Sequence, residues 1–117
     1  MGQTRYTDSW KRREAQLAGE RLKQWRTQRG LSQFELGSRA KVHPQLISDT
    51  ERGRRFPNDD TRLKLAHALG VDPAELLPSI EEYRGLLAEG IVPRAGIEYF
   101  RQMLSDLQER ELARRIS

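Results

Sequence analysis

The stretch GLSQFELGSRAKVHPQLISDTERGRRFP, residues 30–57, decides the fold. It opens with Ser32-Gln33-Phe34-Glu35, a capping-box pattern in which the serine accepts from the third helical amide and the glutamate bonds back to the cap. A short helix follows, with Leu36 and Ala40 directed inward, and it ends near Lys41-Val42.

A second short helix begins directly afterwards, at His43-Pro44. Proline is favourable at a first helical position because its missing N–H would have no partner there in any case. Gly53 ends this helix. Only Leu46, Ile47 and Thr50 offer apolar contact, so one narrow face is buried and the other face is polar and available to a ligand.

Helical patterns continue on both sides of this pair. Upstream, apolar residues recur at helical spacing from Leu17 to Trp25, and the helix ends at Gly30. Downstream, Asn58 caps a helix that carries Asp59 and Asp60 at its positive end and an apolar face to Gly70. Asp72-Pro73 starts one more short helix, which ends near Pro78. The apolar positions of the helix after Asn58 are Leu63, Leu65, Ala66 and Leu69.

The two ends of the chain are less regular. Residues 1–9 are interpreted as an arm, with Asp8 or Ser9 capping a helix that starts at Trp10. Residues 79–117 indicate a helix up to Gly90, a break, and a long helix to about Arg114. We therefore predict an all-α chain with a basic N-terminal arm or helix (1–16), a five-helix domain (17–78) and a helical C-terminal region (79–117).

Composition excludes several classes of protein. The chain has 117 residues, of which 36% are hydrophobic and 32% charged, so it suits one soluble domain with a modest core. The absence of cysteine removes disulfides and thiolate metal sites, and the two histidines, His43 and His67, are too far apart in sequence to form a metal cluster. We expect a cytoplasmic protein without signal peptide, membrane span, metal or cofactor. We also expect no enzyme, since no nucleophile–base set or phosphate-cradling loop is present.

The positive charge lies mainly near the start. Residues 1–31 hold eight Lys/Arg against three Asp/Glu, residues 32–78 seven against seven, and residues 79–117 six against seven, which gives the net charge of +4. A basic N-terminal end suits nucleic acid or an acidic membrane surface, but it also suits a solvated helix face. The cluster Lys11-Arg12-Arg13 carries both interpretations, a DNA-contacting arm or a solvated face.

Two short helices joined by a tight turn form a helix-turn-helix arrangement. The major groove of B-DNA admits one α-helix, and the second helix of such a pair lies in it with its N-terminal residues toward the base edges. That helix here offers His43, Gln45 and Asp49 on its polar face. Ser32, Gln33 and the free amides at the start of the first helix supply donors for a phosphate.

Three segments, GERLKQWRTQRGLSQFEL (19–36), VHPQLISDTERGRRFP (42–57) and TRLKLAHALGVDPAELL (61–77), resemble the lambda-repressor-like (XRE) helix-turn-helix family of transcriptional regulators. The resemblance implies a phosphate contact and a brace for the recognition helix from Gln33, and an ion pair between Arg26 and Glu51. It also implies base-proximal roles for the start of the second helix and backbone contacts from the arginines that follow it. The complete set expected to face DNA is Ser32, Gln33, His43, Pro44, Gln45, Leu46, Asp49, Arg52, Arg54 and Arg55.

The sequence departs from the family pattern at several positions. Gly37 replaces a usual alanine and is expected to cost about 0.5–1 kcal/mol of helix stability. Lys41 replaces the usual turn glycine, so a left-handed backbone there is strained. The other departures are Thr50, Asp59 and Arg62 at usually apolar positions, Pro44, which has no donor side chain, and the acidic Asp49.

Individual residues keep alternative interpretations. His43 either contacts DNA or caps its helix. Gln45 either contacts a base or is a solvated surface residue. Glutamine suits the first role because it can bond adenine through two hydrogen bonds. Asp49 either accepts from a cytosine amino group, excludes other bases, or holds a neighbouring arginine. His67 is interpreted as a surface residue.

The last predicted helix carries an apolar stripe formed by Ile97, Phe100, Met103, Leu104 and Leu107. This stripe either packs on the core or pairs with a second copy of the chain, and we favour dimerisation. The leading hypothesis is a homodimeric repressor that binds double-stranded DNA at a palindromic operator. The first alternative is an autoregulating antitoxin whose C-terminal helices hold a partner protein. A third is an adaptor that binds only protein.

Overall fold

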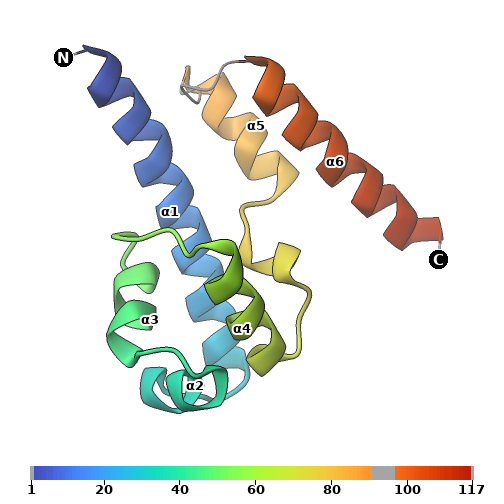
Figure 1. The fold of residues 1–117 in the computed structure, drawn as a ribbon. Coiled ribbons are helices and arrows are strands. Elements are labelled where there is room, and N and C mark those ends of the chain that lie inside the picture. The colour runs from blue at the N-terminus through green and yellow to red at the C-terminus, as the bar shows by residue number, and fades with distance from the viewer. Residues whose placement is uncertain (1, 91–96, 117) are drawn as a thin grey trace. The chain divides into compact units, whose positions relative to one another are not determined.

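The computed structural model describes residues 2–90 and 97–116, and the side chains of residues 9–90, 102 and 105–115. These residues form helices joined by short loops and contain no strand (Figure 1). The predicted all-α fold is confirmed. The elements are α1 (Gly2–Gln28), α2 (Gln33–Ala40), α3 (Pro44–Glu51), α4 (Asp59–Leu69), the 3-10 helix η1 (Pro73–Leu76), α5 (Ile80–Ala88) and α6 (Ile97–Ile116).

Helix α1 is longer at its start than the sequence indicated. It begins at Gly2, so residues 2–9 are helix, and neither Asp8 nor Ser9 caps a helix at Trp10. The prediction of an arm over residues 1–9 was wrong for its described part. The segment 2–9 contains no proline, and each residue added to an existing helix gains a backbone hydrogen bond without a new nucleation cost. The helix therefore extends past both candidate caps.

The chain divides into two compact units. One unit is Arg12–Pro78, and the other combines Met1–Lys11 with Ser79–Ser117. In the first unit, α2 packs on both α3 and α4, and α4 packs on η1. Leu63 of α4, expected inward, is 56% exposed and lies outside the core. The buried cluster consists of Leu22, Leu31, Leu36, Ala40, Val42, Ile47, Leu65, Ala66, Leu69 and Leu76.

The caps predicted for α2, α4 and η1 are present. The Ser32 hydroxyl accepts from the Glu35 amide, and the Glu35 carboxylate accepts from the Ser32 amide, both at 3.0 Å. Asn58 accepts from the Thr61 amide at 2.8 Å, and Asp72 caps η1. These caps satisfy amides that have no partner within their own helices, and they fix where α2, α4 and η1 begin.

The expected helix penalty at Gly37 needs correction. A Cβ built on Gly37 lies 2.6 Å from the Val42 carbonyl oxygen and 3.2 Å from Pro44 Cγ. The turn after α2 folds back this closely because the Val42 amide donates to the Gly37 carbonyl at 2.9 Å. Glycine therefore permits the turn between α2 and α3, and alanine at position 37 would be the destabilising residue.

The second unit is held by an aromatic contact. Trp10 of α1 stacks on Tyr83 of α5, with ring centroids 5.8 Å apart and an interplanar angle of 20°, and both side chains are buried. A capping box between Ser79 and Glu82 starts α5. Of the five residues predicted to dimerise, only the half-buried Leu107 has a described side chain, and the side chains of the other four lie outside the described set.

Candidate nucleic-acid interface

The turn between α2 and α3 sets the direction of α3. Lys41 caps α2 with φ 57° and ψ 46°, the left-handed conformation that the sequence identified as strained. His43 is the N-cap of α3, and its Nδ1 accepts from the Gln45 amide at 3.0 Å. This bond favours the capping interpretation of His43, although its side chain remains exposed.

The outward face of α3 is polar at its start. Gln45 is exposed, and Pro44 and Asp49 are half-buried. The Gln45 side-chain amide donates to the Asp49 carboxylate at 3.0 Å. The partner that the structure gives Asp49 is thus a glutamine one helical turn earlier, where an arginine was one of the alternatives. Leu46, placed among the DNA-facing residues from sequence, packs partly buried against the core.

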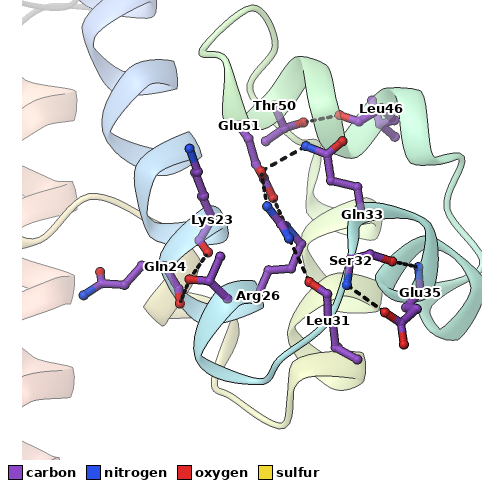
Figure 2. A network of polar contacts seen from close by, with 11 residues as sticks. Lys23, Gln24, Arg26, Leu31, Ser32, Gln33, Glu35, Leu46, Thr50 and Glu51 are labelled. Carbon is purple, nitrogen blue, oxygen red and sulfur yellow. Dashed lines mark hydrogen bonds and ion pairs between the residues drawn. The ribbon is translucent and has the colours of Figure 1, made fainter.

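The far end of α3 is fastened to α1 and α2 (Figure 2). Glu51 accepts from Arg26 Nε at 2.6 Å, from Arg26 Nη2 at 3.0 Å and from Gln33 Nε2 at 3.1 Å. Arg26 Nη1 also donates to the Leu31 carbonyl at 2.7 Å. The side chains of Arg26 and Glu51 are only 12% and 4% exposed. The expected partners therefore meet, and Gln33 touches α3 as a brace would.

The electrostatics of this contact follow from the hydrogen bonds. The bond to Glu51 raises the pKa of the Arg26 guanidinium above its usual value, against the opposing effect of burial. The raised pKa keeps the Arg26 guanidinium in its charged form. A charged, bidentate pair has a strict geometry, so it orients the end of α3 relative to α1.

The close approach of α1 to α3 depends on Gly19, a residue that was not predicted from the sequence to have this role. A Cβ built on Gly19 would lie 2.2 Å from the Thr50 carbonyl oxygen. Thr50 itself is 1% exposed, and its hydroxyl donates to the Leu46 carbonyl at 2.7 Å, which satisfies this polar group in an otherwise apolar position. The available signal was a glycine inside a helical pattern, which often marks such an approach.

Donors for a phosphate lie at the start of α2 and after α3. The Ser32 oxygen accepts from the Glu35 amide, which leaves its O–H able to donate, and Gln33 Nε2 donates one N–H to Glu51 and keeps the other. The first backbone amides of α2 add further donors there. Arg52, Arg54 and Arg55 are all exposed in and after the last turn of α3. In the basic cluster of α1, Lys11 and Arg12 are exposed and Arg13 is half-buried.

No group of three or more His, Asp or Glu side chains able to hold a metal occurs among the described residues. None of the described helices is both long and apolar enough to cross a membrane. His67 is exposed on α4, as interpreted from sequence. The assembled features are thus a fixed short helix with a polar outer face, free amides on the helix before it and arginines after it, which define a helix-turn-helix domain.

Comparison with known proteins agrees with this class. The family model described as "Helix-turn-helix domain" matches residues 17–78. The uncharacterized HTH-type transcriptional regulator y4dJ of Sinorhizobium fredii is 39% identical over 66 residues, which are 56% of this chain and 86% of that protein. Control protein C.BamHI of Bacillus amyloliquefaciens is 39% identical over 62 residues, 52% of this chain and 76% of that protein.

Solved structures show the same fold. The restriction-modification controller protein C.AhdI from Aeromonas hydrophila matches with a TM-score of 0.52 and 36% identity, over 54% of this chain and 96% of that one. A structure titled as a complex of SinR protein and SinI protein matches with a TM-score of 0.51 and 26% identity, over 80% and 96%. The chain belongs to the lambda-repressor-like (XRE) family of helix-turn-helix transcriptional regulators and is a DNA-binding transcription regulator.

Proposed function

We propose that the chain is a homodimeric repressor that binds a palindromic operator through α3. The observation that carries this proposal is that the last turn of α3 is fixed to α1 and α2 while the polar face at its start stays outward. Arg26 and Gln33 hold Glu51 at its last residue, and Gly19 admits its backbone against α1. Gln45 remains exposed at the other end. A recognition helix held in this way presents its side chains to the base edges and loses little further conformational entropy on binding.

Charge supports the requirement for two copies. Residues 32–78 carry no net charge, so binding to the DNA polyanion rests on local arginines and on the basic first 31 residues. One helix-turn-helix domain contacts only a few base pairs. Two domains bound to half-sites one helical turn apart, about 34 Å, add their contacts and raise specificity.

Helix α6 is the proposed dimerisation element. Leu112 on this helix is 56% exposed, and Leu107, from the stripe predicted to pair, is half-buried. Deletion of residues 94–117 is expected to give a monomer with weak operator binding, as measured by sedimentation equilibrium and by titration of labelled DNA. A dimer that persists after the deletion would move the interface to another surface.

Selection from a random DNA pool tests the proposal as a whole. We expect the full chain to enrich two inverted half-sites with centres about 34 Å apart or a multiple of that spacing. Enrichment of a single half-site would contradict the dimer, and no enrichment at all would contradict sequence-specific binding. Loss of reporter expression when the operator overlaps a promoter would distinguish a repressor from an activator.

A second candidate is an antitoxin that also regulates its own operon. It is favoured by the likeness to SinR over 80% of this chain, since that protein was solved in complex with another protein, SinI. Here α5 and α6 would hold the partner. Purification of the chain from its native host would then recover a small protein in equal amount, and purification of the residue 94–117 deletion would not.

A further inference from the structure

The bond between Gln45 and Asp49 has a consequence for base recognition. Asp49 is a carboxylate, which accepts hydrogen bonds and donates none when it is ionised. The group of Gln45 that faces it must therefore be the NH2, and the structure has Nε2 donating to Asp49 Oδ1 at 3.0 Å. A reversed amide would lose this bond and would turn its Oε1 toward the negative oxygens of Asp49. The bond thus fixes which way the Gln45 amide points.

We propose that Asp49 is a positioning residue that makes Gln45 select adenine and reject guanine. The proposal rests on the proposed function, because it concerns the base that the reader on α3 prefers. Asp49 need not touch DNA in this role. Its effect is transmitted through the orientation of the Gln45 amide, one helical turn before it on the same helix.

The donor and acceptor pattern of the fixed amide explains the preference. With one N–H bonded to Asp49, Gln45 retains one N–H and its Oε1, and no described residue donates to that oxygen. Adenine offers N7 as an acceptor and its N6 amino group as a donor in the major groove, which matches this pattern. Guanine offers two acceptors, N7 and O6, so it would meet only one donor and would face Oε1 with a second acceptor.

Two substitutions at Asp49 separate orientation from charge. Asp49→Asn keeps the size of the side chain, but its amide can also donate to Gln45, so Gln45 can reverse and offer both N–H groups to guanine. Asp49→Glu keeps an acceptor-only carboxylate. Loss of a negative charge near phosphates raises affinity for all sequences alike, so the adenine-to-guanine ratio isolates the orientation effect. Asp60→Asn, which removes an exposed carboxylate from α4, is the matched control.

The experiment uses the full chain and the DNA that it selects from a random pool. The position read by Gln45 is the one whose preference disappears in Gln45→Ala, and competition binding then gives the adenine-to-guanine ratio there. For the wild type, we expect the affinity for DNA with adenine at this position to exceed the affinity for DNA with guanine by a factor of about 10 or more. For Asp49→Glu and Asp60→Asn, this affinity ratio should stay within about twofold of the wild-type ratio. For Asp49→Asn, it should fall to about 3 or less.

An unchanged ratio in Asp49→Asn would overturn the inference, as would a wild-type preference for guanine at that position. Both results leave the proposed function intact, because the protein still selects a sequence and still depends on Gln45. Failure of the wild type to select any sequence would instead remove the proposed function together with the inference. The two failures are therefore distinguishable in one experiment.

Discussion

The pair between Arg26 and Glu51 gives a quantitative test of how α3 is held. Removal of one member of a buried ion pair costs about 3–5 kcal/mol, because the other charge is left without compensation. For Glu51→Met we expect the lower end, about 3 kcal/mol. Arg26 is 12% exposed and keeps its bond to the Leu31 carbonyl, so water and one acceptor still reach it. For Arg26→Met we expect a similar or larger cost, since Glu51 is only 4% exposed.

The double variant separates the pair from its surroundings. Two methionines fill a similar volume without charge, so Arg26→Met with Glu51→Met is expected to cost about 1 kcal/mol or less. The coupling energy is then several kcal/mol, as measured by urea unfolding of all four proteins. At about 4–8 °C per kcal/mol, each single variant also melts about 12 °C or more below the wild type.

A matched exposed pair serves as the control for this cycle. Lys64 and Asp60 lie 3.1 Å apart on α4, with side chains 49% and 75% exposed, and Lys64→Met should cost less than about 1 kcal/mol. If the costs of Arg26→Met and Glu51→Met simply add in the double variant, the two side chains do not act as a unit. The view of α3 as a helix fixed by this pair would then be refuted.

Three further predictions follow from individual contacts. Gly37→Ala should destabilise the domain by about 1–3 kcal/mol in urea unfolding. The control is the neighbouring exposed residue, where Ser38→Ala should be neutral or stabilising. A Gly37→Ala variant as stable as the wild type would contradict the close approach of position 37 to the Val42 carbonyl. Arg54→Ala with Arg55→Ala should weaken binding to all DNA sequences and reduce the slope of log K against log salt by about 2, and an unchanged slope would exclude phosphate contacts. Hydrogen bonds from Ser32 lower the pKa of Glu35 below its usual 4.5, so its stabilising effect is present above pH 4.5 and is lost as the pH falls through the lowered value. Glu35→Gln should therefore lose less stability than the wild type between pH 6 and pH 3, and equal losses would exclude Glu35 as a source of acid sensitivity.

Local signals allowed much of the fold to be predicted. The capping box at Ser32 and Glu35, the cap at Asn58 and the proline after His43 each concern residues within three positions of one another, where the chain geometry leaves few alternatives. The pairing of Arg26 with Glu51 spans 25 residues and came from the family resemblance. Spacing alone could not have provided it.

Other features depend on distant backbone and were not accessible from local patterns. The role of Gly37 is set by where the Val42 carbonyl lies after the turn, and the role of Gly19 by how closely α3 approaches α1. Helix propensity alone therefore predicts the opposite sign at Gly37 from the one that this close contact predicts. The bond between Gln45 and Asp49 is different, because glutamine and aspartate four residues apart on a helix are known to interact, and that spacing was present in the sequence.

The most direct test of α3 as the recognition helix is the discrimination between operator and random DNA by Gln45→Ala. Gln45 is exposed and its side chain bonds to Asp49 on the same helix, so the substitution should leave stability within about 0.5 kcal/mol of the wild type. We expect the ratio of operator affinity to random-DNA affinity to fall about tenfold or more, while binding to random DNA stays the same. An unchanged ratio in a stably folded Gln45→Ala protein would contradict the account.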